Sequence, residues 1–148
     1  MPKQYHQGLF TPVHPEKYEG DPTMICYRSS WELKTFKWCD LNPSVLKWSS
    51  EEIRINYICA TDNRRHTYFP DLKIKMKTKS GEIKTYLVEI KPLKETMPPK
   101  RKGKYYLSES LTYIKNQSKW KYAKEYCKDR GWEFIVLTEQ DLGLTGSR

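Results

Sequence analysis

The sequence contains few residues of the kinds that bind zinc, with four cysteines and three histidines among 148 residues. No two cysteines form a CxxC pair and the histidines have no ligand spacing, so we do not expect a zinc site. No apolar run approaches 18 residues and no signal-like stretch follows Met1, so we expect neither membrane contact nor secretion. The scattered cysteines are then expected to be reduced thiols of a cytoplasmic protein.

Acidic residues are also scarce relative to basic ones. Asp and Glu number 18 against 27 Lys and Arg, which gives a formal charge of +9. Such an excess favours polyanionic partners, with nucleic acid first among them. Hydrophobic residues make up 37% and aromatic residues 14% of the chain, so a folded core is expected, and the length suits one compact domain.

The distribution of proline and of apolar residues predicts an α/β organisation. Residues 1–27 carry four prolines and are predicted to form an extended N-terminal arm, followed by the main domain at residues 28–148. In that domain we predict a helix from Ser29 to Pro43, strands at 51–60, 66–79 and 82–91, a basic loop at 92–104, helices at 107–114 and 118–130, a strand at 132–137 and a helical turn after Thr138. This order predicts a central mixed β-sheet flanked by helices. The first three strands can form a meander, and the last, reached by a helical crossover, can pair in parallel.

The hairpin around Ser80 and Gly81 has two possible registers. A two-residue loop would place the apolar rows of its strands on opposite faces of the sheet. A three-residue loop with a left-handed Gly81 pairs Leu72 with Val88 and unites those rows on one buried face. Burial is worth about 1.5–3 kcal/mol per large side chain, so we predict the second register.

This register places Asp71 opposite Glu89, close enough for both carboxylates to contact one ion. Two such carboxylates suit Mg²⁺, a hard cation that takes oxygen ligands. Lys91 follows on the same face as Glu89 and can orient a water or stabilise developing charge on a phosphodiester. Pro92 holds Lys91 in an extended conformation at the end of the strand.

Two further features allow more than one interpretation. Glu32 stands three residues after Ser29, so it is either the partner in a capping box or a catalytic residue. The basic loop directly follows the predicted site, which favours contact with phosphate over a merely solvated surface. Its cations are Lys94, Lys100, Arg101, Lys102 and Lys104.

The motifs "YFPD" at 68–71 and "VEIK" at 88–91, with Glu32 upstream, resemble the PD-(D/E)xK nuclease superfamily. More narrowly, "YEGDP…YRSSWE", "EIKPLKETMPP" and "YIKNQSKWKYAKEYCKDRGWEFIVLTE" look like the head-completion nucleases of tailed bacteriophages. The resemblance extends from about residue 18 to residue 140.

This resemblance implies a restriction-endonuclease-like core and DNA cleavage that depends on a divalent metal. It implies that Asp71, Glu89 and Glu32 hold the metal and that Lys91 is the catalytic lysine. The superfamily often has a further Gln or basic residue near the phosphate. Gln117 and Lys119 are both available for that role, and the sequence does not choose between them.

The leading hypothesis is therefore a DNA endonuclease that uses Mg²⁺, with Mn²⁺ as a possible substitute, and acts on phage DNA during head completion. The alternative is a non-catalytic DNA-binding plug or adaptor of the phage head. An RNA-binding module is less favoured because no stacking motif is present. We expect phage head or neck proteins as partners, and the host cytoplasm or the virion head as the location.

Overall fold

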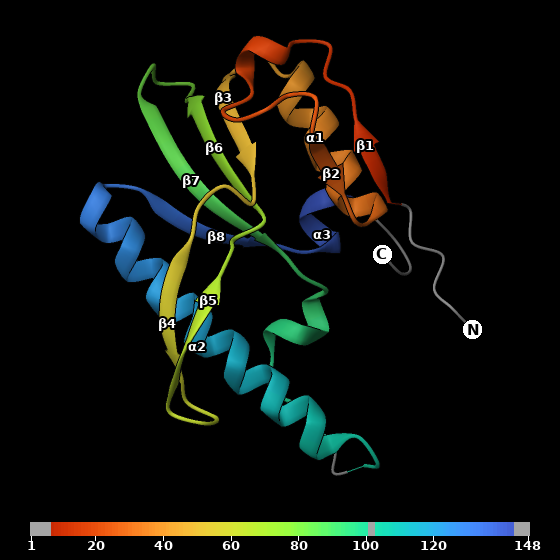
Figure 1. The fold of residues 1–148 in the computed structure, drawn as a ribbon, viewed down its shortest axis with the longest axis vertical. Coiled ribbons are helices and arrows are strands. Elements are labelled where there is room, and N and C mark those ends of the chain that lie inside the picture. The colour runs from red at the N-terminus through yellow and green to blue at the C-terminus, as the bar shows by residue number, and fades with distance from the viewer. Residues whose placement is uncertain (1–6, 101–102, 144–148) are drawn as a thin grey trace.

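A computed structural model describes residues 7–100 and 103–143 of the chain. Its centre is a four-stranded sheet in the order β3-β6-β7-β8 (Figure 1). The strands are β3 (Val45–Ser50), β6 (Leu72–Lys77), β7 (Ile83–Ile90) and β8 (Glu133–Leu137). The first three run antiparallel, whereas β7 and β8 are parallel. The predicted mixed sheet with a parallel last strand is confirmed.

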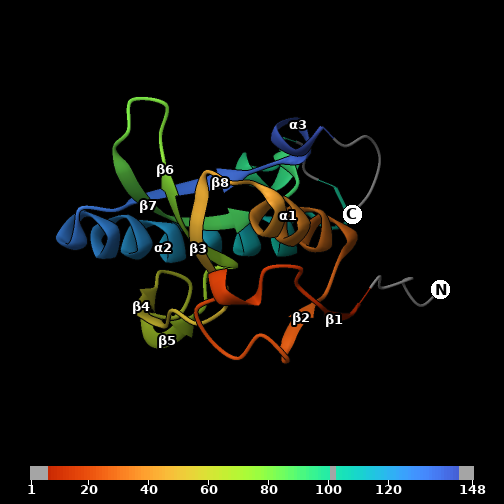
Figure 2. The same ribbon diagram turned by 90° about the horizontal axis from the view of Figure 1, so that it is seen from above.

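Two helices cover the two faces of this sheet, as Figures 1 and 2 show. They are α1 (Ser30–Leu41) and α2 (Tyr106–Arg130). Side chains in β7 alternate between the faces, so Val88 joins the core cluster that contains α1 and Leu87 joins the cluster that contains α2. The apolar run of β7 is thus explained by burial on both sides.

The proline-rich N-terminal segment packs against α1. Its described part contains β1 (Gly8–Phe10), one turn of 3-10 helix, η1 (Pro15–Lys17), and β2 (Ile25–Tyr27), which pairs with β1. Phe10, Tyr18 and Ile25 are buried in the α1 cluster. Lys17 Nζ donates to the carbonyl oxygens of Cys39, Asp40 and Asn42 at the end of α1. The division into an arm and a main domain at residue 28 stays a prediction.

The register of the β6–β7 hairpin is the predicted one. Leu72 pairs with Val88, and the Thr78 N–H donates to the Glu82 carbonyl oxygen at 2.7 Å. Gly81 has φ of 89°, the left-handed conformation that the three-residue loop requires.

The predicted three-strand meander does not form one sheet, although antiparallel pairing between its consecutive strands occurs. The strand expected at 51–60 is shorter, β4 (Ile55–Cys59), and pairs with β5 (Arg64–Tyr68) in a separate two-stranded ribbon. The single strand expected at 66–79 is divided into β5 and β6, because Pro70 has no N–H to donate and the chain turns there. The place beside β6 is taken by β3, which the sequence interpretation missed.

The two helices predicted at 107–114 and 118–130 are one continuous helix, α2. Ser118 does not cap a helix; its buried Oγ instead accepts a hydrogen bond from the Ala60 N–H at 3.1 Å. The helix ends at Gly131 in the left-handed conformation, as expected. A short helix, α3 (Glu139–Leu142), follows the capping box of Thr138. None of the helices in the described ranges combines the length and apolar character needed to cross a membrane.

Candidate active site

The Asp71 carboxylate lies where β6 begins, beside the end of β7. Its Oδ2 accepts a hydrogen bond from the Ile90 N–H at 2.7 Å, which fixes the carboxylate against the neighbouring strand. Burial raises the pKa of Asp71 well above its usual value, and the negative charge of Glu89 raises it further. The register thus brings Asp71 and Glu89 together as the sequence predicts.

Glu89 is buried and is held by two polar neighbours. Its Oε1 accepts a hydrogen bond from the Tyr68 hydroxyl at 2.5 Å, and Lys91 Nζ lies 3.7 Å from its Oε2. Burial, and then the charge of Glu89, raise the pKa of Tyr68, so the phenol stays a neutral donor. Glu89 and Lys91 therefore share one face, next to Asp71.

Glu32 combines a helix-start contact with a place among the site's carboxylates. The Ser29 Oγ accepts a hydrogen bond from the Glu32 N–H at 3.1 Å, so Ser29 caps α1 as expected. The Glu32 Oε1 accepts from the Arg28 N–H at 2.9 Å, one residue earlier than a capping box requires. One carboxylate oxygen of Glu32 also lies within 4.8 Å of oxygens from Glu51 and Asp71. Glu32 thus contacts the backbone just before α1 and also lies among these carboxylates; its catalytic role stays a prediction.

Glu51 is the member of this group that the sequence interpretation missed. It follows β3, and its N–H donates to the Asp71 carbonyl oxygen at 3.2 Å. Its φ of 54° is uncommon for a residue with a side chain, and its carboxylate forms an ion pair with Arg28. The signal that could have found it is the segment "VLKWSS": read as a strand paired with β6, it places Glu51 beside Asp71.

The carboxylates of Glu32, Glu51 and Asp71 fit a hard divalent cation. They offer oxygen ligands only, and the three ligand atoms lie within 4.8 Å of one another. These three residues would hold such an ion, and its positive charge would offset the repulsion between their carboxylates. Glu89 acts on this group through its charge on Asp71; its role as a ligand stays a prediction.

Lys119, rather than Gln117, lies near these acids. Its ammonium is 5.5 Å from the centre of the Tyr68 ring, the ring whose hydroxyl contacts Glu89. Burial lowers the pKa of Lys119, and the positive charge of Lys91 lowers it further. Gln117 is exposed on the same helix. A phosphate-binding role for either residue stays a prediction.

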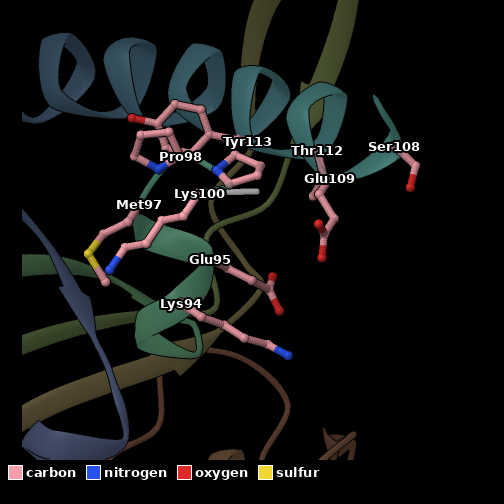
Figure 3. A pocket seen from close by; sticks show the side chains of 10 residues that line it. Lys94, Glu95, Met97, Pro98, Lys100, Ser108, Glu109, Thr112 and Tyr113 are labelled. Atoms are coloured by element: carbon pink, nitrogen blue, oxygen red, sulfur yellow. The ribbon is translucent and has the colours of Figure 1, made fainter. Parts of the chain in front are cut away.

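The basic segment after β7 is only partly a loop. It contains one turn of 3-10 helix, η2 (Leu93–Thr96), and with the start of α2 it lines a cavity of about 570 Å³ (Figure 3). Lys94 and Lys100 line this cavity, together with the acids Glu95 and Glu109. Lys104 is exposed near the start of α2. The other two predicted contacts, Arg101 and Lys102, lie outside the described residues.

Residues 42–139 match the family model of the TnsA-like endonuclease N-terminal domain. The match covers most of the chain and includes Glu51, Asp71, Glu89 and Lys91, while Glu32 precedes it. The chain therefore belongs to the TnsA-like endonucleases, and the predicted restriction-endonuclease-like α/β fold is confirmed.

Within that class, the chain is 38% identical to the head completion nuclease of Enterobacteria phage T4. The similarity covers 95% of this chain and 96% of that protein. The predicted relationship to phage head-completion nucleases and the predicted endonuclease function are thereby confirmed.

Proposed function

We propose that this protein is a Mg²⁺-dependent DNA endonuclease of the PD-(D/E)xK type that hydrolyses phosphodiester bonds of phage DNA during head completion. The observation that carries the proposal is the convergence of three carboxylates, from Glu32, Glu51 and Asp71, within 4.8 Å. Lys91 belongs to the same group of charges, 3.7 Å from Glu89. The name of the phage T4 relative supports the place of the reaction in head completion.

The acids and the lysines have different tasks in the proposed reaction. Glu32, Glu51 and Asp71 would hold the ion, with Glu89 as a further candidate ligand. A bound Mg²⁺ supplies Lewis-acid polarisation of the phosphate and makes water more acidic. Lys91 donates a hydrogen bond to the attacking water or to the phosphate as its charge develops. Lys119 and the lysines after β7 position the DNA strand through its phosphates.

The reaction is tested by incubating the protein with duplex, branched and single-stranded DNA in Mg²⁺, Mn²⁺ or EDTA. The proposal predicts new DNA ends in Mg²⁺ or Mn²⁺ and none in EDTA. Salt-sensitive DNA binding without cleavage of any of the three substrates would instead support the plug or adaptor at the phage head.

The ligand set is tested by a pair of neighbouring variants, Glu51→Gln and Glu52→Gln. Both remove one negative charge, but Glu51 belongs to the carboxylate group whereas Glu52 is exposed beside it. We expect Glu51→Gln to weaken Mn²⁺ binding by about 10- to 100-fold, and Glu52→Gln to change it less than about threefold. Mn²⁺ binding is measured by electron paramagnetic resonance. Equal effects of the two variants would remove Glu51 from the ligand set.

The same proposal places the reaction in the host cytoplasm, or in the virion head after assembly. Head or neck proteins of the phage are the proposed partners. The name of the phage T4 relative supports this assignment. Pull-down from infected cells with the Asp71→Ala variant would detect such a partner.

A further inference from the structure

The ribbon formed by β4 and β5 grows directly out of the candidate active site. The chain leaves the main sheet after Glu51 and returns to it at Asp71. The Glu51 N–H donates to the Asp71 carbonyl oxygen at 3.2 Å, so both ends of the ribbon meet at two of the three clustered carboxylates. Figures 1 and 2 show the ribbon outside the main sheet, beside α2.

The inner face of the ribbon is held rigidly. Ile55, Tyr57 and Tyr68 are buried in the core cluster that contains α2, and Tyr68 reaches Glu89 through its hydroxyl. At the other end of the ribbon, the Ala60 N–H is bonded to Ser118 of α2. His66 Nε2 lies 2.8 Å from Asp62 Oδ2 and fixes the turn. The ribbon therefore has a set position relative to the site.

The outer face is exposed and carries no acid. It consists of two cross-strand pairs, Asn56 with Thr67 and Ile58 with Arg65, and all four residues are exposed. Alternation along the strands puts them on the side opposite to the buried residues. A guanidinium, an amide and a hydroxyl stand there beside a half-exposed isoleucine.

This chemistry suits base edges better than phosphates alone. The chain has 20 lysines and seven arginines, yet the outer face presents an arginine and no lysine. Arginine and asparagine form paired hydrogen bonds with base edges, and an apolar side chain can contact the thymine methyl group. The major groove, about 12 Å wide, admits a two-stranded β-ribbon.

We propose that the outer face of the β4–β5 ribbon enters the major groove of duplex DNA next to the bond that is cut. This inference rests on the proposed endonuclease function and names duplex DNA as what the ribbon contacts. Arg65 precedes Asp71 by six residues, which at about 3.3 Å per residue spans at most about 20 Å. The ribbon contact therefore falls within about six base pairs of the cleaved bond, at about 3.4 Å per pair.

The test compares the variants Arg65→Ala and Arg64→Ala. Arg65 belongs to the outer face of the ribbon, whereas Arg64 is paired with Cys59 and belongs to the inner-face register. Both residues are exposed and both substitutions remove one positive charge. Binding of the full-length protein to a 30-base-pair duplex and to a single strand is measured in EDTA, where cleavage is blocked. We expect Arg65→Ala to weaken duplex binding about tenfold and Arg64→Ala less than about threefold. We expect neither variant to change single-strand binding by more than about threefold.

Several outcomes would overturn the groove contact: equal duplex losses in the two variants, an equal loss on single-stranded DNA, or no duplex binding by the unmodified protein. The two proposals fail in different ways. If the protein cuts no DNA in Mg²⁺ but the duplex-selective loss in Arg65→Ala persists, the endonuclease proposal fails and the ribbon contact stands. If cleavage is normal and requires Asp71 while Arg64→Ala and Arg65→Ala behave alike, only the ribbon contact fails.

Discussion

The Asp71 carboxyl lies where its charged form is disfavoured in the metal-free protein. Burial and the nearby Glu89 raise its pKa in the folded state above the ordinary value of 3.8. Between that value and the raised one, the folded chain binds a proton that the unfolded chain has lost. The free energy of unfolding therefore falls as the pH rises through this range. Above the raised pKa, the charged Asp71 lowers the free energy of unfolding by its full amount.

Removing this charge should stabilise the metal-free protein. We expect Asp71→Asn to raise the melting temperature in EDTA at pH 8 by about 2–4 °C, with a smaller gain as the pH approaches 4. The amide oxygen can still accept from the Ile90 N–H. Thermal unfolding followed by circular dichroism checks this, with exposed Asp129→Asn as the control. A lower melting temperature for Asp71→Asn at pH 8 would show that Asp71 stabilises the fold.

The pairing of Asp71 with Glu89 could be predicted because it depends on a local hairpin. A single loop length and the burial of two apolar rows decide which residues meet. Glu51 could not be found in the same way. It lies beside Asp71 because β3 pairs with β6, and the whole β4–β5 ribbon separates these two strands in the sequence. Such long-range pairing leaves no periodic signal between the two strands.

At the scale of elements, α2 and the ribbon form a single packed unit. Ser118 has the type and position of a helix cap in sequence, yet it lies inside α2 and binds the Ala60 N–H. The sequence interpretation divided the helix there because serine is a common N-cap residue, and the sequence does not reveal the bond to a distant backbone group. The extents of β7 and β8, by contrast, are predicted to within one residue, because each strand contains a short apolar run, residues 86–88 and 134–137.

Loss of the Ser118 hydroxyl should loosen the ribbon. We expect Ser118→Ala to lower the free energy of unfolding by about 1–2 kcal/mol, because the Ala60 N–H loses its partner. Hydrogen exchange should be faster at the ribbon amides than in the unmodified protein. Ser110→Ala, in the same helix, is the control and should change stability by less than about 0.5 kcal/mol. Unchanged exchange in the ribbon of Ser118→Ala would contradict the role of this contact.

At the scale of the whole molecule, the carboxylates gather at one place while the chain as a whole is strongly basic. The formal charge is +9, and Lys94, Lys119 and Arg65 lie on η2, α2 and β5, elements that adjoin or pack beside the site. The excess of positive charge attracts a polyanion, whereas the clustered carboxylates favour binding of a cation between them.

DNA binding should therefore depend steeply on salt. With six or more phosphate contacts, we expect affinity for duplex DNA in EDTA to fall by about 10³-fold between 50 and 200 mM NaCl. Fluorescence anisotropy measures this, and Asp71→Ala should give the same slope because it removes no phosphate contact. A nearly flat salt dependence would contradict a phosphate-based interface.

The most direct test of the proposed site is single-turnover cleavage of DNA in Mg²⁺ by the unmodified protein and by Asp71→Ala, both at saturating protein. If Asp71 holds the catalytic ion, the variant should cut at least about 10³-fold more slowly, because several kcal/mol of transition-state stabilisation are lost. Its DNA affinity in EDTA should stay within about threefold of the unmodified protein. Cleavage by Asp71→Ala at a rate close to that of the unmodified protein would contradict the assignment.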